Sequence, residues 1–371
     1  HKAIRRQRQM CIRDSSYNFE DRKLVEIVKA TYFNPKIVVI DETTTALSQE
    51  GREELYKHME RIRKSGNTVI FISHDLPEII EKSDTITILR DGVYIDTVKS
   101  KDVNENDLKK LMVGREVTGD YYRSDYGEKI SDEVVLSAKH VTVPGLIEDV
   151  SFDLHKGEIL GFGGLSESGM HEIGKAIFGA SYDREGTVEL ADGTQINDIP
   201  TAIKHSIAYT SKDRDNESVV LNQSIGDNIC LPSLDELSGP AHLISDKKKK
   251  DFANKFAKQM SVKMVDVNQF VSNLSGGNKQ KVVLARWIGK DSDIVVLDSP
   301  TRGIDIKVKQ DIYQLMNQMR KNGKSIIMIS EELMELIGMC DRIMIMKDGK
   351  ISGELERDQN LDENGLITMM V

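Results

Sequence analysis

Two stretches of the chain share one pattern of apolar and polar positions. The first, residues 37–92, opens with Ile37, Val38, Val39 and Ile40, which predicts a short strand of the kind buried in parallel sheets. Gln49–Lys64 has apolar residues at helical spacing and is followed by Gly66, where a helix would stop. Thr68–Ile72 predicts a second buried strand. Strands alternating with helices predict an α/β fold with a parallel sheet.

The same pattern returns in the second half of the chain. Ile294–Gly349 aligns with Ile37–Gly92 without a gap, at an offset of 257 residues (294 − 37), and Asp298 falls on Asp41. A repeat of this length predicts a duplicated domain rather than a solenoid. We therefore expect two domains, of which the first is incomplete.

Polar residues follow both predicted strands of the first copy. Asp41 and Glu42 end the first strand, and His74 follows the second. Ligands of open α/β sheets bind outside the carboxyl ends of the strands. An acid that can hold a metal ion, next to a second acid that can act as a base, predicts a site for phosphate hydrolysis.

Composition limits the classes of function. The chain has 371 residues, 39% of them hydrophobic, which is enough for two cores. A net charge of −9 disfavours a bulk attraction to nucleic acid or to anionic lipid. The three cysteines have no metal-like spacing, and no apolar run approaches the length needed to span a membrane.

Changes in composition suggest the domain boundaries. Residues 1–16 are basic and lie outside the repeated pattern, so we interpret them as a foreign tail, with a nucleic-acid-binding arm as the alternative. Residues 17–115 form the carboxyl-terminal part of the first domain. The polar, tyrosine-rich residues 116–132 are the predicted linker, and residues 133–371 are the second domain.

The second domain opens with a predicted phosphate-binding element. Val134–Val143 suggests an edge hairpin, and Glu158–Phe162 a buried strand. A glycine-containing loop, residues 163–169, then leads into a predicted helix from Met170 to Phe178. Such a strand, loop and helix present backbone N–H groups and a helix amino end to an anion.

This loop lacks the residues that a functional phosphate loop needs. Such loops end in Gly-Lys-Ser/Thr, but Met170 and His171 stand at the last two positions, and Glu167 replaces a usual glycine. Loss of the lysine alone is expected to weaken ATP binding about tenfold to a hundredfold. Weak binding without hydrolysis and no binding both stay open. The residues assigned to this degenerate loop are Gly164, Glu167, Ser168, Gly169, Met170 and His171.

The second copy also lacks the chemistry at its strand ends. Ser299 falls on Glu42 and Glu331 falls on His74, while Asp298 is kept. Serine is a poor general base near neutral pH, and glutamate cannot present a neutral imidazole to a phosphate. We therefore expect no hydrolysis at the loop of the second copy.

The most specific string in the chain is LSGGNKQ, residues 274–280. It opens the apolar helix KVVLARWI, and in that position it resembles the signature of ABC-type ATPases. A serine and two glycine N–H groups at a helix start form an anion site. The nucleotide-binding residues predicted here are Leu274, Ser275, Gly276, Gly277, Asn278 and Gln280.

Further strings extend the resemblance. GGLSESGMHE, SKDRDNESVVLNQSIGDNI, DSPTRGID, SEEL and LMVGRE are similar to motifs of the fused, tandem ATP-binding subunits of bacterial monosaccharide importers, whose familiar members serve ribose, galactose and xylose uptake. The resemblance implies tandem ABC-type P-loop ATPase domains, each with a parallel-sheet core, a helical signature subdomain and an antiparallel edge sheet.

The resemblance also implies two composite ATP sites. In the first, Asp41 would hold Mg²⁺ through water, Glu42 would polarise the attacking water, His74 would sense the γ-phosphate, and the 274–280 segment would close the site. Its phosphate loop would lie before residue 1, so this chain alone is expected to have negligible ATPase activity. The second site would join Gly164–Glu172 with Tyr17–Asp21, where Phe19 and Glu20 replace two glycines.

The partners implied are the membrane permease subunits of a sugar importer, with an extracytoplasmic sugar-binding protein acting indirectly and no nucleic acid. The chain would lie peripherally on the cytoplasmic face of the bacterial membrane. Val219–Leu234 is the predicted permease contact, through Leu221, Ile225, Ile229 and Leu231. The alternatives are a soluble tandem ABC ATPase that acts on ribosomes or DNA, and a non-catalytic ABC scaffold.

Overall fold

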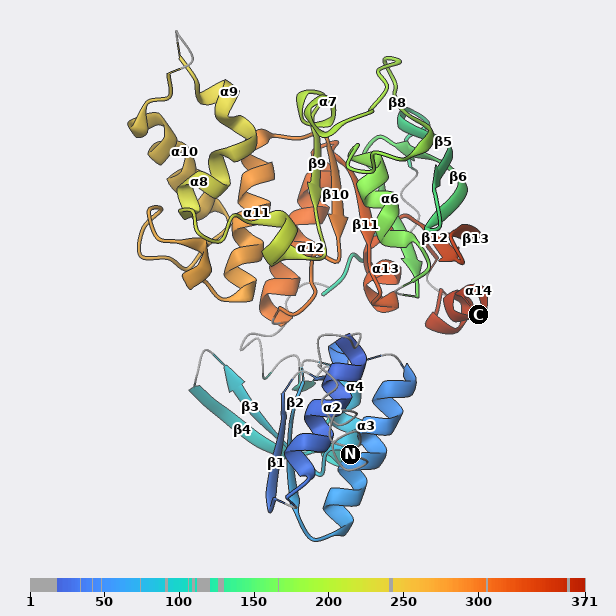
Figure 1. The fold of residues 1–371 in the computed structure, drawn as a ribbon, viewed down its shortest axis with the longest axis vertical. Coiled ribbons are helices and arrows are strands. Elements are labelled where there is room, and N and C mark those ends of the chain that lie inside the picture. The colour runs from blue at the N-terminus through green and yellow to red at the C-terminus, as the bar shows by residue number, and fades with distance from the viewer. Residues whose placement is uncertain are drawn as a thin grey trace, which may run out of the picture. The chain divides into compact units, whose positions relative to one another are not determined.

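The computed structural model describes most of the chain as two compact units, residues 1–118 and residues 119–371 (Figure 1). The described residues are 19–33, 35–41, 43–47, 49–73, 75–90, 93–105, 107–108, 111, 121–125, 130–165, 167–239, 243–304, 306–358 and 361–370. Within these ranges, no helix combines the length and the apolar character needed to cross a bilayer.

Unit 1 contains two two-stranded sheets. β1 pairs with β2 in parallel, and β3 pairs with β4 in antiparallel. The predicted helix, residues 49–64, and the predicted second strand, residues 68–72, agree with α3 and β2 in both bounds. The elements of unit 1 are α2 (Phe19–Thr31), β1 (Ile37–Asp41), η2 (Thr43–Ala46), α3 (Gln49–Lys64), β2 (Thr68–Ile72), α4 (Leu76–Lys82), β3 (Thr85–Arg90), β4 (Val93–Lys99) and η3 (Ser100–Asp102).

The burial of β1 differs from the prediction. Val38 and Ile40 are buried in a small core with residues of α3, but Ile37 and Val39 are each 59% exposed. The prediction of a fully buried strand is therefore wrong for one face of β1. It is also wrong for β2, whose Ile70 and Ile72 are 47% and 45% exposed. The physical reason is that no layer covers that face in the part of unit 1 that the structure describes.

Unit 2 is built on a six-stranded sheet with the strand order β13-β12-β7-β11-β10-β9. All neighbours are parallel except β12 and β13. The apolar runs of β7, β10 and β11 are buried throughout, as expected for central parallel strands. The strands of this sheet are β7 (Ile159–Gly164), β9 (Ile207–Thr210), β10 (Ile294–Asp298), β11 (Ser325–Ile329), β12 (Arg342–Lys347) and β13 (Lys350–Glu356).

A second, antiparallel sheet joins β5 (Val134–Val143), β6 (Ile147–His155) and β8 (Glu185–Leu190) in the order β6-β5-β8. The prediction that residues 134–143 form an edge hairpin is wrong. They form one long strand in the middle of this sheet, since β6 pairs with one side of β5 and β8 with the other. The hairpin is made by β5 together with β6.

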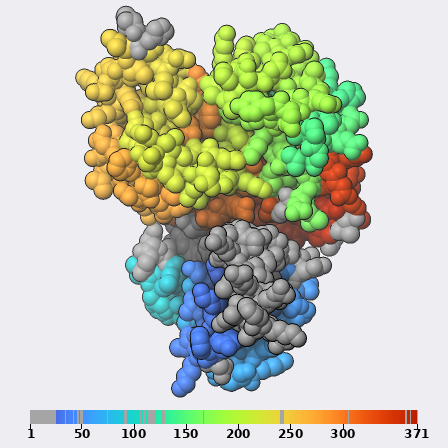
Figure 2. All heavy atoms as spheres, in the orientation of Figure 1, coloured from blue at the N-terminus to red at the C-terminus, as the bar shows by residue number. Residues whose placement is uncertain are grey.

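In Figure 2, the yellow to orange residues 225–239 and 243–290 lie on one side of unit 2, and the green residues 134–165 and 167–210 lie on the other. The helices and helical turns are α6 (Met170–Ile177), α7 (Ile199–Lys204), the π-helical turn η4 (Arg214–Ser218), α8 (Ile225–Cys230), η5 (Leu231–Ser233), α9 (Leu234–Leu237), α10 (Asp246–Gln259), η7 (Val271–Asn273), α11 (Gly276–Lys290), α12 (Ile306–Lys321), α13 (Leu333–Met339) and α14 (Glu363–Met370).

Helix α8 shows that the predicted permease contact was partly misassigned. α8 packs against α10 and α11, and Ile225 and Ile229 are fully buried in the core of unit 2. The apolar face of this short helix is thus used inside the unit. Within the predicted segment, Val220 and Leu231 are the residues with large exposed apolar surfaces.

Residues 121–125 of the predicted linker are anchored on unit 2. The ring centroids of Tyr121 and Tyr122 lie 5.5 and 5.3 Å from that of Tyr313. The Arg123 side chain is 1% exposed and donates to Asp341 Oδ1 at 2.7 Å. Because a buried guanidinium needs a counter-charge, this pair fixes the segment in place.

Candidate functional site

The loop between β7 and α6 ends in a glycine whose backbone conformation a larger residue would not readily adopt. Gly169 caps α6 with a φ of 89°, in the left-handed region that favours glycine. A Cβ added there would lie 2.5 Å from the carbonyl oxygen of Leu146, so a larger residue does not fit. Ser168 is buried, and its Oγ has no hydrogen-bond partner among the described residues.

His171 is the centre of a buried polar cluster at the start of α6. Its Nδ1 lies 2.6 Å from Oδ1 of Asp298, at the end of β10, and its Nε2 lies 3.3 Å from Oε1 of Glu331. The hydroxyl of Tyr209 donates to Oδ2 of Asp298 at 3.4 Å. The structure thus brings together three residues that the sequence assigned to the degenerate site.

Charge and burial act in opposite directions on this cluster. Burial lowers the pKa of the His171 imidazole, but its hydrogen bonds to Asp298 and Glu331 outweigh burial and raise that pKa above the usual value. The His171 side chain is 2% exposed and that of Asp298 is fully buried. A charged histidine ring is therefore favoured between the two carboxylates.

Ser299 is held in an unusual backbone conformation. Its φ is 47°, in the left-handed region, and its N–H donates to the carbonyl oxygen of Ile329 at 2.8 Å. Its hydroxyl lies 3.5 Å from Oδ1 of Asp298, at the limit of a hydrogen bond. The site therefore has no carboxylate at this position, as the sequence indicated.

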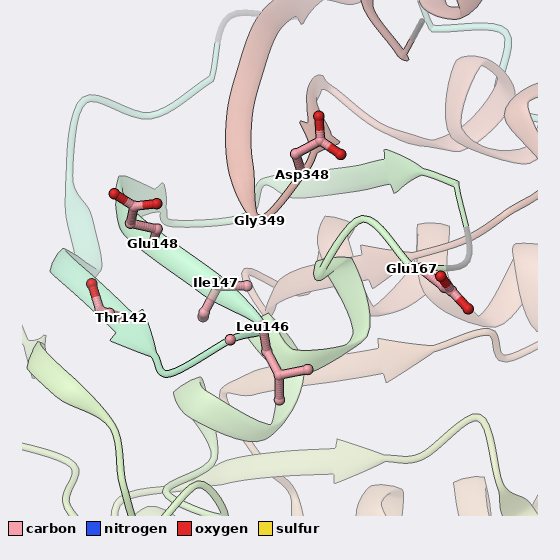
Figure 3. Close-up of a pocket in the computed structure, with 8 residues that line it drawn as sticks. Thr142, Leu146, Ile147, Glu148, Glu167, Asp348 and Gly349 are labelled. Carbon is pink, nitrogen blue, oxygen red and sulfur yellow. The ribbon is translucent and has the colours of Figure 1, made fainter.

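A pocket of about 490 Å³ lies beside the loop (Figure 3). Three of its lining residues are acidic: Glu148, Glu167 and Asp348. Their carboxylates would repel a polyphosphate, which adds to the weakness already expected from the missing lysine. The remaining lining residues are Thr142, Gly145, Leu146, Ile147 and Gly349.

The LSGGNKQ segment lies at the start of α11, as predicted. Ser275 is the N-cap residue, and α11 begins at Gly276. The Ser275 hydroxyl accepts a hydrogen bond from Nδ2 of Asn278 at 2.9 Å, which positions it at the helix start. Leu274 and Gln280 are buried, while Gly277 belongs to the first turn of the helix. The amino end of a 15-residue helix is a suitable place for an anion.

Two basic residues near this helix start were missed by the sequence analysis. Nη2 of Arg214 would lie 3.0 Å from a Cβ at Gly276, so the guanidinium is beside this glycine. Lys279 pairs with Asp215 at 2.9 Å, which ties α11 to the η4 turn. The string SKDRD, residues 211–215, contained the signal, because its last two residues are Arg214 and Asp215.

In unit 1, the strand ends have the predicted arrangement. Asp41 pairs with Ile72 in the parallel register of β1 and β2, so the two strands end side by side. Asp41 is exposed. Glu42 and His74, the two predicted catalytic residues, lie outside the described residues, as does Tyr17. Their roles therefore stay predictions.

A buried glutamate ties the two strand-end loops together in both copies, which the sequence analysis also missed. In unit 1, Glu78 accepts hydrogen bonds from Thr44 at 3.1 Å, Ser73 at 2.7 Å and the hydroxyl of Tyr56. We call these four residues the glutamate hub. Thr44 follows β1 and Ser73 follows β2, so the hub fixes the backbone on either side of the predicted catalytic positions.

Unit 2 repeats this hub at the same offset of 257 residues. Glu335 accepts from Thr301 at 2.6 Å, Ser330 at 2.9 Å and the hydroxyl of Tyr313. Lys309 adds a cationic partner at 3.4 Å. Four matched residues in one matched network show that the two copies share their local structure as well as their sequence pattern.

Comparison with known proteins agrees with this geometry. A family model described as ABC transporter matches residues 147–302. The ribose import ATP-binding protein of Lactococcus lactis subsp. lactis (strain IL1403) is 41% identical over 344 residues, which are 92% of this chain and 69% of that protein. The xylose import ATP-binding protein of Thermoanaerobacter pseudethanolicus is 42% identical over 350 residues, 91% of this chain and 68% of that protein.

Solved structures support the fold. The dimeric structure of a bacterial ABC transporter cassette matches with a TM-score of 0.53 at 22% identity, covering 60% of this chain and 99% of that one. A nucleotide-free ATP-binding cassette from an ABC transporter matches with a TM-score of 0.54 at 18% identity, covering 64% of this chain and 99% of that one. The fold is the α/β fold of ABC ATP-binding cassettes, and the chain belongs to the family of ribose and xylose import ATP-binding proteins of ABC transporters.

Proposed function

We propose that this chain is the ATP-binding subunit that energises import of a monosaccharide of the ribose or xylose type, with two ABC-type domains in tandem. One composite ATP site is hydrolytic and the other is degenerate. The printed functions of the relatives support sugar import. The observation that carries the asymmetry is the contrast between an exposed Asp41 and a buried, histidine-bound Asp298.

The residues at the end of β1 suit Mg²⁺. Asp41 presents an exposed carboxylate, and hard oxygen donors are the ligands that this ion prefers. A bound magnesium ion would neutralise charge on the phosphates. In this proposal Asp41 holds the ion through water, Glu42 polarises the attacking water, and His74 senses the γ-phosphate.

The LSGGNKQ segment supplies the anion-binding part of the hydrolytic site. Ser275 and the N–H groups of Gly276 and Gly277 bind the γ-phosphate at the start of α11. Arg214 strengthens this site because its guanidinium lies beside Gly276. Sandwiching of ATP closes the domains, and hydrolysis reopens them and shifts the permease between its two states.

The test is sugar uptake by a bacterial strain whose own ATP-binding subunit is deleted, complemented with the complete open reading frame that contains this sequence. We expect Glu42→Gln to lower ATP-dependent uptake of labelled ribose or xylose at least about a hundredfold, the usual contribution of a general base. Glu53→Gln, the same chemical change at an exposed position of α3, is the control and should transport normally. Full uptake by Glu42→Gln would contradict the proposal.

The permease contact is proposed at Val220 and Leu231, the exposed apolar residues of the 219–234 segment. Leu231→Asp should reduce co-purification with the permease subunits because it places a charge in an apolar interface. Leu243→Asp is the matched control, since Leu243 is 73% exposed and lies outside this segment. Equal loss with both variants would remove the assignment.

Docking on the permease would place the chain peripherally at the cytoplasmic face of the membrane.

A further inference from the structure

The second copy has an acid where the first copy is proposed to hold Mg²⁺, but its surroundings do not suit that ion. Magnesium needs nearly octahedral oxygen ligands at about 2.0–2.1 Å. In unit 2, Oδ1 of Asp298 is already in a 2.6 Å contact with Nδ1 of His171, and the imidazole stands at the loop position where a hydroxyl would help to hold the ion. The ligand atoms beside Asp298 and the space left for an ion both differ from those that a magnesium site needs.

The hydrogen bonds of this cluster favour a charged histidine ring. An ionised carboxylate can only accept hydrogen bonds, and an imidazole donates from both nitrogens only when it is protonated. Nδ1 of His171 faces Asp298, and Nε2 faces Glu331. Both contacts are satisfied together by an imidazolium between two carboxylates, which is a cation already in place at this strand end.

We propose that the His171 side chain substitutes for the metal ion in the second copy, so that Asp298 binds no divalent cation and this loop is a metal-free site. The inference rests on the proposed function only in treating residues 164–172 as a nucleotide loop. The loss of the metal site is then more than a missing ligand. One residue, His171, both removes the metal-binding hydroxyl and neutralises the acid that is left behind.

The rest of the loop agrees with a metal-free site. Ser168 Oγ is buried without a partner among the described residues, and the amino end of α6 faces the loop. Uncharged hydrogen-bond donors for an anion therefore remain in the loop. Tyr209 donates to the second oxygen of Asp298. Both oxygens of Asp298 therefore already accept a hydrogen bond from the protein, the stronger one from His171.

The test counts bound Mn²⁺, a paramagnetic substitute for Mg²⁺, by electron paramagnetic resonance in the presence of ATP. The proteins are the whole chain and its Asp298→Asn, His171→Thr and doubly substituted variants. We expect the parent and Asp298→Asn to bind the same amount of Mn²⁺. His171→Thr should gain a Mn²⁺ site that the parent lacks, and the double variant should lose it again.

Either of two results would overturn the proposal: loss of bound Mn²⁺ from the parent on Asp298→Asn, or no gain by His171→Thr. Circular dichroism checks that each variant folds.

A second measurement uses the parent protein alone, so it does not depend on any variant being stable. With ¹⁵N-labelled histidine, Mn²⁺ and ATP should leave the ring resonances of His171 sharp, because Mn²⁺ at Asp298 would broaden them beyond detection. Broadening would contradict the proposal. None of these readouts depends on sugar uptake, so they fail independently of the proposed function.

Discussion

The parallel strand pairs β1–β2 and β10–β11 have the same register and nearly the same apolar sequence, but only the second pair is buried on both faces. Val39 is 59% exposed, whereas its counterpart Val296 is fully buried. The difference comes from α6, which crosses the sheet of unit 2. A Cβ added at Gly174 of that helix would lie 3.4 Å from Val296. Burial of a strand is thus set by the layer placed on it, and the strand sequence alone does not decide it.

The glutamate hubs give the opposite comparison, because they are alike in both units. Glu78 is 6% exposed and Glu335 is 1% exposed, and each holds a threonine, a serine and a tyrosine. The difference is one cation: Lys309 reaches Glu335, whereas Arg52, its counterpart, donates to the backbone carbonyls of Thr44 and Leu47. The framework around the strand ends was kept while the chemistry at those ends diverged.

The largest predicted effect distinguishes the two hubs. Glu335→Ala should reduce the free energy of unfolding of unit 2 by about 3–4 kcal/mol, because it leaves three hydroxyl donors unsatisfied and leaves the buried Lys309 with Glu332 alone, at 2.6 Å, as its carboxylate partner. Glu78→Ala should cost unit 1 about 1–3 kcal/mol, the cost of unsatisfied hydrogen-bond donors. Scanning calorimetry, in which the two units are followed as separate transitions, makes the comparison. Equal losses would mean that Lys309 contributes nothing to the hub.

The next effect tests the exposed face of unit 1. Val296→Asn should destabilise unit 2 by about 3 kcal/mol, since it buries an amide without partners and removes apolar contacts. Val39→Asn should change the stability of unit 1 by less than about 0.5 kcal/mol, as expected for an exposed position. The same calorimetric measurement applies. A loss at Val39 as large as that at Val296 would show that another layer covers this face in solution.

A smaller effect compares the strand-start acids Asp341 and Asp84, which also occupy equivalent positions. Asp341 accepts from Arg123 and from the N–H of Ile159 at 2.8 Å, whereas Asp84 is exposed. Asp341→Asn should cost about 1–2 kcal/mol because one charged hydrogen bond is weakened while Asp125 still pairs with Arg123. Asp84→Asn should be nearly neutral. Urea midpoints of the two variants would separate these expectations, and a neutral Asp341→Asn would contradict them.

The sequence predicted most of the fold for reasons that particular residues make clear. The bounds of α3 and β2 follow from local signals, namely helical spacing, Gly66 and a run of β-branched residues. The role of β5 as a central strand could not be predicted in this way, because its second partner β8 is about 40 residues further along the chain. The exposure of Val39 likewise depends on a layer that its own strand does not specify.

The candidate site shows the same limit. The sequence located Asp298, His171 and Glu331 separately, as residues that depart from a motif, but only the folded chain shows that they bond to one another. The hubs and Arg214 were missed because each is a contact between segments that are distant in sequence. Motifs locate the strand ends well, while the partners of each residue there are a property of the fold.

The smallest predicted effect concerns acid and the anchored segment 121–125, for which unit 1 has no described counterpart. Burial raises the pKa of the Asp125 carboxyl, but the hydrogen bond and charge of Arg123 outweigh burial and lower it to about 2. A lowered pKa contributes stability that is present above the unfolded value, about 3.9, and is lost as the pH falls towards 2. Docking of the segment should therefore weaken between pH 4 and pH 2.

Hydrogen exchange at the Arg123 amide, which donates to the carbonyl oxygen of Gly338 at 3.2 Å, measures this docking directly. After correction for the intrinsic exchange rate, its protection should be constant from pH 7 to pH 5 and should fall below pH 4. Asp125→Asn should have lower protection throughout and a flatter pH dependence, because the titrating group is gone. If the variant and the parent lost protection along the same curve, acid would be acting on another carboxylate, and Asp341, the second partner of Arg123, would be the group to test.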